Sequence, residues 1–339
     1  MRYQSLGNSD LEVSVLCLGT MMFGGPTDSS EVSNIMARAR DAGVNFVDTA
    51  DVYNQGNAEQ ELRPFLKASR SDWVLASKVG NEMGKARDMC GLSRRWIDKA
   101  LDDSLRRLGT DYIDVYYLHR EDPDTPLAET VDALARHMAA GKIRYFGVSN
   151  FRAWRLAAIC GACDAAGVPR PVVSQPYYNA LNRMPEVEHL PACRYFGLGT
   201  VPYSPLARGV LSGKYRPGEQ PSADTRAGRN DKRMLESEWR PESLLAAQHI
   251  KTHAEANGTT AIAFALNWVL NNKLVTAVIA GPRTDAQWQT YIGALDYAFT
   301  WSDEAFMDRL VAPGHPSTPG YNDPRYPIEG RISRVRPVS

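Results

Sequence analysis

Three apolar segments of this chain each end in polar residues of a different chemical type. Asn45–Tyr53, with the sequence NFVDTADVY, carries Asp48 at the end of its apolar run and Tyr53 in the turn that follows. Two later segments, VLASK ending at Lys78 and IDVYYLH ending at His119, repeat the pattern. Consecutive buried strands with polar carboxyl ends are typical of a parallel α/β barrel or a doubly wound sheet. These polar side chains are therefore expected to share one site.

The four residue types suit the reduction of a carbonyl group. A free tyrosine has a pKa of about 10, so Tyr53 needs a nearby cation to give up its proton near neutral pH. Lys78 supplies that cation, and Asp48 supplies the carboxylate that keeps a buried lysine charged. His119 would donate a hydrogen bond to the carbonyl oxygen or orient it. The set predicts a proton donor for an oxygen that gains negative charge as hydride reaches carbon.

These motifs resemble the catalytic tetrad of the aldo-keto reductases, in the Asp48-to-Tyr53 spacing, the ASK ending and the YYLH ending. The resemblance covers nearly the whole chain. It implies a single (β/α)8 barrel domain over residues 1–339. It also implies reversible reduction of an aldehyde or ketone to the alcohol, with NADPH giving the hydride, NADP+ as its oxidised form and Tyr53 as general acid. Each residue alone would be an ordinary polar group at a strand end, and no metal ion is implied.

Further matches concern the nicotinamide cofactor. The endings GVSN and QPYYN resemble family segments in which Ser149, Asn150 and Gln175 would hydrogen-bond the nicotinamide carboxamide, a group that needs both donors and acceptors. The YSPL segment implies that Tyr203 stacks on the nicotinamide ring, the alternative being an ordinary core aromatic. The residues after it would wrap the pyrophosphate: Ser204, Leu206, Arg208 and Gly209.

The carboxyl ends of the first and eighth strands of the expected barrel would also border the nicotinamide cofactor. Residues at the tips of these strands are expected to bind it: Gly19, Thr20, Ile279 and Gly281. The last strand-to-helix turn of such barrels is a phosphate site, because helix N-terminal amides favour anions. Arg283 adds a cation suited to a phosphate monoester, which predicts a preference for NADPH. Gln287 is expected to contact phosphate, but the stretch Gln287–Tyr291 departs from the family pattern and leaves the adenine contacts open.

Segments outside the expected barrel predict the rest of the site. Residues 1–14 contain two short extended pieces around a Gly-Asn-Ser-Asp turn, which predicts a hairpin across one end of the barrel. Residues 213–240 are too long and polar for a plain connection and predict a lid loop after strand seven. Its arginines either reach the cofactor phosphates or are solvated: Arg226, Arg229 and Arg233. Residues 313–339 are rich in proline and predict a non-helical tail over the site.

Local signals predict a helix, a loop and a substrate mouth. The helix begins after Ser93, which caps it, and stops at Gly109. Its Arg106-Arg107 pair is expected on a solvated face rather than at an anion site. The polar stretch Gly80–Leu92 is expected to form a wall over the site. Met22 and Phe23 either line the mouth or are simply packed.

Composition restricts the classes of function. Lys plus Arg and Asp plus Glu each number 39, so no net charge favours nucleic acid or an anionic membrane. The N-terminus lacks the apolar core of a signal peptide, and no segment approaches the roughly 20 apolar residues of a membrane span. A cytoplasmic protein with a small-molecule carbonyl partner is therefore expected. The five scattered cysteines form no disulfide framework, and Cys160 and Cys163 are expected to be buried helix thiols.

Two other interpretations stay open at this point. Some relatives of these reductases are potassium-channel subunits that keep the barrel and a bound cofactor while turning over slowly. A barrel isomerase with Lys78 or His119 as base is the other, but it leaves the nicotinamide-type residues without a common purpose. No Rossmann glycine fingerprint is present, so the cofactor would be held by barrel loops. The motifs specify neither the physiological carbonyl nor the oligomeric state.

Overall fold

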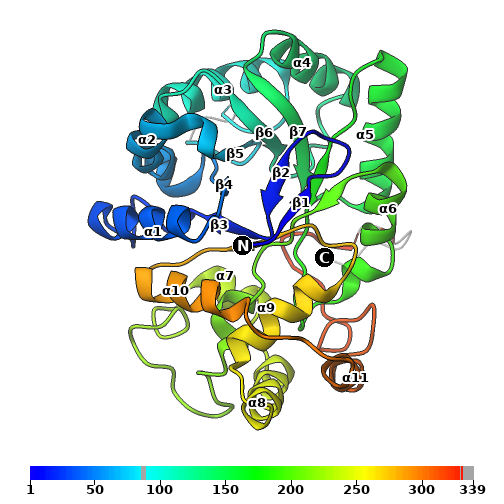
Figure 1. Ribbon diagram of the computed structural model, residues 1–339. Helices are drawn as coiled ribbons and strands as arrows, with labels where there is room; N and C mark the ends of the chain where they lie inside the picture. Colours follow the sequence, from blue (N-terminus) through cyan, green and yellow to red (C-terminus); the bar gives the residue numbers. More distant parts are fainter. Residues whose placement is uncertain (85–88, 329, 331–339) are drawn as a thin grey trace, which may run out of the picture.

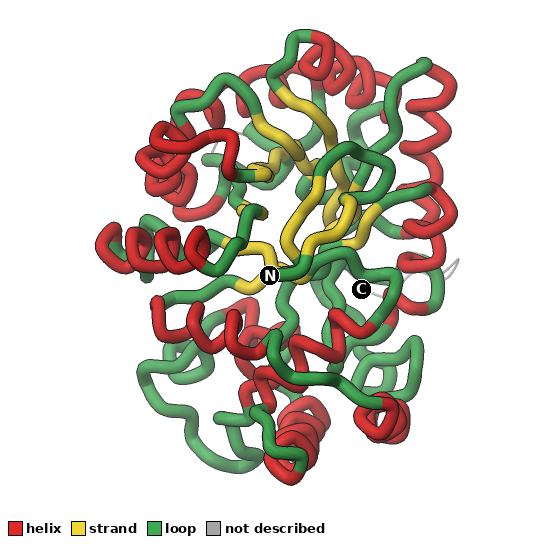
Figure 2. The backbone as a smooth tube through the Cα atoms, viewed as in Figure 1, coloured by secondary structure: helices red, strands yellow, loops and turns green. Residues whose placement is uncertain are grey.

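The computed structural model describes residues 1–84, 89–328 and 330, in which eight parallel strands form one sheet in the order β10-β3-β4-β5-β6-β7-β8-β9. The strands are β3 (Leu16–Gly19), β4 (Phe46–Asp48), β5 (Val74–Val79), β6 (Ile113–Leu118), β7 (Ile143–Ser149), β8 (Val173–Gln175), β9 (Gly199–Thr200) and β10 (Val278–Ala280). The sheet closes because Ile279 N–H donates to the Pro202 carbonyl at 3.0 Å and Thr276 N–H to the Thr200 carbonyl at 2.8 Å. The predicted (β/α)8 barrel is confirmed (Figures 1 and 2).

Helices surround the sheet and pack their apolar faces against it. The barrel helices are α1 (Ser29–Asp41), α2 (Asn57–Ser69), α3 (Arg94–Leu108), α4 (Leu127–Ala139), α5 (Ala153–Ala166), α6 (His189–Phe196), α9 (Ala261–Asn271) and α10 (Asp285–Ala294). The other helices and 3₁₀ turns are α7 (Lys232–Ser237), α8 (Pro241–Ala256), α11 (Trp301–Leu310), η1 (Tyr53–Gly56), η2 (Arg70–Asp72), η3 (Met184–Glu186) and η4 (Ala207–Ser212). No helix in the described ranges is long and apolar enough to cross a bilayer.

The bounds of α3 follow the predicted caps. The Ser93 side chain accepts a hydrogen bond from Trp96 N–H, and Gly109 ends the helix at a φ of 67°, in the left-handed region that glycine favours. The prediction of a solvated Arg106-Arg107 pair is wrong for Arg107. This side chain turns toward α2 and pairs with the fully buried Glu59 at 2.7 Å, because a carboxylate at that depth needs a cationic partner.

The predicted hairpin, β1 (Tyr3–Ser5) and β2 (Glu12–Ser14), covers the amino-terminal end of the barrel (Figure 1). Leu6, Leu11 and Val13 are buried and share one apolar cluster with side chains of the barrel interior. The backbone N–H of Asn8 donates to the carbonyl of Gly197, just before β9, at 3.0 Å. The hairpin therefore plugs the end of the barrel opposite the predicted site.

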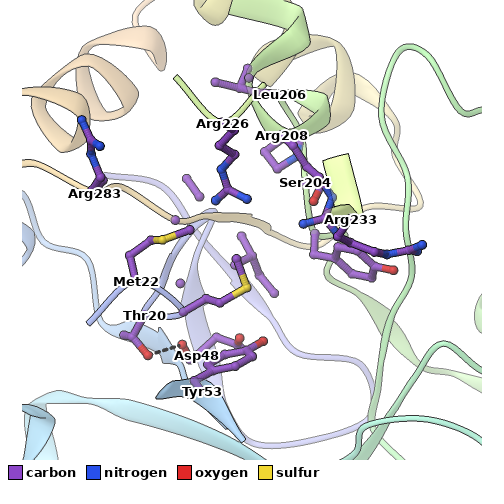
Figure 3. A pocket seen from close by; sticks show the side chains of 18 of the residues that line it. Thr20, Met22, Asp48, Tyr53, Ser204, Leu206, Arg208, Arg226, Arg233 and Arg283 are labelled. Atoms are coloured by element: carbon purple, nitrogen blue, oxygen red, sulfur yellow. Dashed lines mark hydrogen bonds between the residues drawn. The ribbon is translucent and has the colours of Figure 1, made fainter. Parts of the chain in front are cut away.

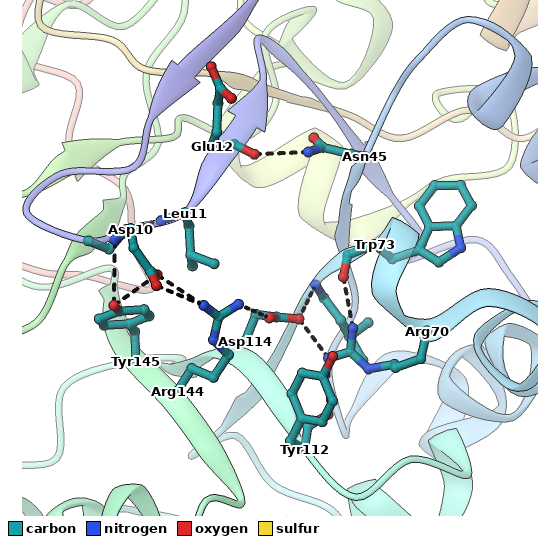
Figure 4. Close-up of polar contacts among 12 residues, drawn as sticks. Asp10, Leu11, Glu12, Asn45, Arg70, Trp73, Tyr112, Asp114, Arg144 and Tyr145 are labelled. Atoms are coloured by element: carbon teal, nitrogen blue, oxygen red, sulfur yellow. Dashed lines mark hydrogen bonds and ion pairs between the residues drawn. The ribbon is translucent and has the colours of Figure 1, made fainter.

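A buried carboxylate connects three strands beneath the hairpin (Figure 4). Asp114 on β6 is 2% exposed and accepts hydrogen bonds from Arg70 at 2.6 Å, Leu75 N–H at 2.9 Å and Arg144 at 2.9 Å. Arg144 on β7 also pairs with Asp10 of the hairpin at 3.0 Å. The network fixes the register of β5, β6 and β7 at the end of the barrel away from the site.

The lid segment (residues 213–240) and the tail segment (residues 313–328) contact each other. Arg233, in α7 of the lid segment, donates to the carboxylate of Asp323 in the tail segment at 2.8 Å. Asp323 is 8% exposed. The tail segment is therefore fastened along the lid segment rather than free in solvent.

We expect Asp114→Ala to lower the free energy of unfolding by about 3 kcal/mol, because it leaves Arg70 and the Leu75 N–H buried without their acceptor. Urea denaturation measures the change. Asp164→Ala is the matched control: it removes an ion pair with Arg170 whose side chains are 49% and 42% exposed, and it should cost less than about 1 kcal/mol. Equal losses in both variants would contradict a structural role for the Asp114 network.

Candidate active site

A cavity of about 780 Å³ opens at the carboxyl ends of the barrel strands. All predicted site residues except Lys78 line it. Figure 3 shows Asp48 and Tyr53 on the barrel side of the cavity, with Arg208 and Arg226 across from them. The strand tips and the loops after them therefore converge on one space, as expected for a parallel barrel.

Lys78 lies behind the cavity wall with no exposed surface. Its ammonium donates to the Asp48 carboxylate at 2.5 Å, to the Thr49 carbonyl at 2.8 Å and to the Tyr53 hydroxyl at 3.1 Å. The second Asp48 oxygen accepts a hydrogen bond from the Gln175 side-chain amide at 2.8 Å. All three ammonium protons and both carboxylate oxygens are thus engaged, which is the condition for burying such a pair.

The charges in this cluster depend on one another. Burial lowers the pKa of Lys78, but the Asp48 charge and the Tyr53 hydroxyl more than offset this, and the net shift is upward. Burial raises the pKa of Asp48, with Lys78 opposing the rise. Burial also raises the pKa of Tyr53, again against Lys78. Tyr53 therefore keeps its proton at neutral pH and is available as a donor.

His119 faces the Tyr53 ring edge-on, with ring centroids 5.9 Å apart and planes at 82°. Burial lowers the pKa of His119 well below its usual value, and the positive charges of Lys78, Arg325 and Arg120 act in the same direction. The imidazole is therefore neutral at pH 7, with one nitrogen that donates and one that accepts. Its Nδ1 has no hydrogen-bond partner among the described residues.

Asn150 fixes the side chains on the other wall of the cavity. Its amide NH₂ donates to the His119 carbonyl at 2.9 Å and to Ser149 Oγ at 3.0 Å, and its Oδ1 accepts from the Tyr203 hydroxyl at 2.7 Å. Asn150 adopts a φ of 56°, in the left-handed region that asparagine tolerates better than most residues. The Ser149 hydroxyl donates to the Gln175 carbonyl at 3.0 Å. These internal bonds hold the predicted carboxamide-binding side chains in set orientations.

Two guanidinium groups meet on the wall opposite Tyr53. Burial and the charge of Arg208 lower the pKa of Arg226. Arg208 stands 3.9 Å from the buried Glu238 carboxylate, and Arg226 stands 3.7 Å from Asp231. Both ion pairs are longer than a hydrogen bond, so each guanidinium retains donors for another acceptor. An anion bound between the two arginines would relieve their repulsion.

The remaining cations of the lid segment and the last turn differ in their partners. Arg229 donates to the carbonyl of Asp224 within the lid segment, and Arg233 is committed to Asp323. Arg283 forms no ion pair with a described residue, and its backbone N–H donates to Gln287 Oε1 at 2.8 Å. Arg283 and Gln287 both border the cavity at the N-terminal end of α10.

Six lining residues were not predicted individually: Asn81, Arg120, Lys214, Asp224, Arg325 and Tyr326. Asn81 lies in the stretch predicted to form a wall, and Lys214 and Asp224 lie in the predicted lid loop. Arg325 and Tyr326 belong to the tail that was expected over the site, and the described part of that tail lines it. Arg120 directly follows His119, so its position was the available signal. Residues 85–88 of the predicted wall, with 329 and 331–339 of the tail, lie outside the described residues.

The sequence left open whether Met22 and Phe23, in the loop after β3, line the substrate mouth or are simply packed. Met22 lines the cavity, whereas Phe23 is fully buried in the core.

On α5, Cys160 and Cys163 are free and buried, as expected. Burial raises the pKa of Cys160 to about 11 and that of Cys163 to about 12. Neither thiol is poised for nucleophilic chemistry.

Comparison with known proteins agrees with this geometry. The pattern of the Aldo/keto reductase family matches residues 15–312. The chain belongs to the aldo/keto reductase family. As a member of this family, it is an oxidoreductase with a barrel that brings the tetrad-type residues together.

Individual relatives carry different names. A probable voltage-gated potassium channel subunit beta of Arabidopsis thaliana is 36% identical over 301 residues, covering 87% of this chain and 92% of the relative. The uncharacterized oxidoreductase YrpG of Bacillus subtilis (strain 168) is 36% identical over 307 residues, covering 87% and 91%. L-glyceraldehyde 3-phosphate reductase of Escherichia coli (strain K12) is 30% identical over 324 residues, covering 93% of each.

The neutral His119 should make the folded aldo/keto reductase sensitive to acid. The unfolded chain binds a proton at this histidine below about pH 6.5, while the folded chain does so only at lower pH, so stability present above about pH 6.5 is lost as pH falls. From about pH 6.5 to 5.5, wild type should lose about 1 kcal/mol more of its unfolding free energy than His119→Gln. Denaturant titrations at each pH measure this. Parallel profiles of the two proteins over this range would show that His119 is charged in the folded state.

Proposed function

We propose that this chain reduces an aldehyde or ketone to the alcohol, reversibly, with NADPH as hydride donor and Tyr53 as proton donor. The observation that carries the proposal is the buried Lys78 ammonium, 3.1 Å from the Tyr53 hydroxyl and 2.5 Å from Asp48. A fixed cation at a tyrosine hydroxyl stabilises the phenolate that forms when the proton leaves. No such stabilisation is needed for a tyrosine that only packs.

The cavity fits a dinucleotide phosphate. Its mutually repelling Arg208 and Arg226 suit a pyrophosphate. Arg283, which forms no ion pair with a described residue and lies beside the start of α10, suits a phosphate monoester. At the other end of the cavity, the amide and hydroxyl groups of Ser149, Asn150 and Gln175 would hold the carboxamide, with the Tyr203 ring beside it. When bound, NADPH would supply the hydride.

The proton chemistry follows from the tetrad. As negative charge develops on the carbonyl oxygen, the Tyr53 hydroxyl transfers its proton to that oxygen, and Lys78 stabilises the phenolate left behind. Asp48 keeps Lys78 charged and in place through the 2.5 Å ion pair. Neutral His119 offers an N–H to the same oxygen and orients it. In alcohol oxidation the phenolate takes the proton back, so one arrangement serves both directions.

A channel-subunit role is the alternative suggested by the names of three relatives, among them the Arabidopsis thaliana protein. Both that relative and an oxidoreductase match this chain at 36% identity, so identity does not separate the roles. The site contains all four tetrad-type residues, and the lysine is engaged with both of its partners. This arrangement supports turnover, which NADPH oxidation with a panel of aldehydes and ketones tests directly.

Tyr53→Phe should lower kcat by about 10²- to 10⁴-fold and leave NADPH affinity within about twofold, because only the reacting hydroxyl is lost. Initial rates from NADPH absorbance give kcat, and quenching of protein fluorescence gives the affinity. Tyr195→Phe, at a side chain that is 82% exposed, is the control and should match wild type. Turnover within a fewfold of wild type in Tyr53→Phe would remove this tyrosine from the mechanism.

Arg283→Ala should raise the KM for NADPH about 10- to 150-fold and leave the KM for NADH nearly unchanged. The basis is a pair of charge-assisted hydrogen bonds to the extra phosphate, worth about 1.5–3 kcal/mol. Arg226→Ala is the matched control: it should weaken both cofactors alike, since both carry the pyrophosphate. If Arg283→Ala also weakens both equally, Arg283 holds the pyrophosphate or the fold, and the NADPH preference has another origin.

A further inference from the structure

The cavity is strongly basic although the whole chain has no net charge. Among the described residues that line it, eight are arginine or lysine and three are acids, Asp48, Glu82 and Asp224. Asp48 is already neutralised by Lys78. The cofactor phosphates of the proposed function would account for the cations across the cavity from Tyr53. Two further arginines lie at the tetrad end of the cavity instead.

Arg120 and Arg325 stand at the tetrad end of the cavity. Arg120 directly follows His119 at the end of β6 and lines the cavity. The Arg325 guanidinium donates to Asn81 Oδ1 at 3.1 Å, and Asn81 follows β5, the strand that carries Lys78. Both positive charges act on His119, where they help keep its pKa low. The two arginines therefore flank the place where a carbonyl must lie to meet the tetrad.

A hydrogen bond within the tail segment holds the backbone of Arg325 in position. Its backbone N–H donates to Asp323 Oδ1 at 2.9 Å, and Asp323 is held by Arg233 of the lid segment. This anchor presents the Arg325 side chain to the cavity while using none of its guanidinium protons. The tail thus delivers a cation to the substrate end of the site.

Neither arginine is neutralised by a described residue. Arg325 has a neutral amide as its acceptor, and Arg120 has no ion pair within the described chain. Arg233 shows the contrast, because Asp323 balances its charge. Glu82 also lines the cavity and, like Arg120 and Arg325, is exposed, and its single carboxylate offsets at most one of the two positive charges.

We propose that the carbonyl substrate carries an anionic group, a carboxylate or a phosphate, which Arg120 and Arg325 bind while the carbonyl meets Tyr53. Arginine pairs with such groups through two parallel charge-assisted hydrogen bonds, which gives orientation as well as attraction. Binding at this end places the anion beyond the tetrad, away from the cofactor phosphates. The inference rests on the proposed function and names its substrate class.

Matched substrates that differ in charge test it. The first pair is 4-carboxybenzaldehyde and 4-carbamoylbenzaldehyde, and the second is glycolaldehyde phosphate and glycolaldehyde. Wild type should prefer the charged member of at least one pair by about tenfold or more in kcat/KM. Arg120→Met and Arg325→Met should each reduce that kcat/KM by about five- to tenfold, which is about 1–1.4 kcal/mol. The loss should fall on KM, and neutral aldehydes should change less than about twofold.

Three controls separate the outcomes. Arg170→Met, whose guanidinium pairs with Asp164 outside the cavity, should leave every ratio at the wild-type value. NADPH affinity should be unchanged in Arg120→Met and Arg325→Met; a drop in it would assign these arginines to the cofactor and overturn the inference. Calorimetric titration of 4-carboxybenzaldehyde and glycolaldehyde phosphate into the NADP+ complex of Tyr53→Phe reads anion binding without turnover.

The two proposals fail in different ways. If both neutral aldehydes are reduced but neither pair shows a charge preference, or if the preference survives both arginine variants, the substrate inference is wrong and the reductase function stands. If no aldehyde or ketone supports NADPH oxidation, the proposed function is wrong. In that case the calorimetry still tests the anion site, with Arg120→Met or Arg325→Met added to Tyr53→Phe. Weaker binding of the anionic aldehydes than in Tyr53→Phe alone supports the site, and equal binding overturns it.

Discussion

The site depends on one buried ion pair, between Lys78 and Asp48. Taking both charges out of water is costly, and the pair persists only if its other hydrogen-bonding groups are satisfied. The protein meets this condition with the Thr49 carbonyl, the Tyr53 hydroxyl and the Gln175 amide, from the ends of β4 and β8 and the turn after β4. The hydrogen bond from Lys78 to the Tyr53 hydroxyl helps to stabilise the buried ion pair and also orients Tyr53 toward the cavity. The stability of the pair and the chemistry of the tyrosine therefore depend on the same contact.

Barrel closure is what makes these contacts available. Asp48 lies on β4 and Gln175 on β8, strands that are not neighbours in the sheet, yet their side chains meet at 2.8 Å over the barrel interior. An open sheet with the same strand order would hold these strand tips apart. The hairpin plug and the Asp114 network secure the opposite end of the barrel, which leaves the carboxyl ends free to carry loops that differ in length and charge.

Sequence predicts best those features that short stretches determine. Each tetrad-type residue follows a local apolar run, and the caps of α3 at Ser93 and Gly109 are read from adjacent positions, so both could be predicted. Pairings between distant segments could not. The bond from Arg233 to Asp323 spans 90 residues, and that from Arg107 to Glu59 spans 48. A basic residue looks the same in sequence whether it meets solvent, a cofactor or a buried carboxylate, because its partner is chosen by the fold.

The site is thus built from two kinds of structure with different tolerance for change. The tetrad-type residues and the side chains that Asn150 holds rest on strand ends and the turns after them, where a shift of one side chain disturbs several buried partners. The lid segment carries the opposite wall and the tail segment reaches the substrate end, and the two segments are joined by the largely buried pair of Arg233 and Asp323. Substitutions in the tail can change charge at the substrate end without touching the Lys78 cluster. Carbonyl specificity can therefore diverge within this fold while the Lys78 cluster stays fixed.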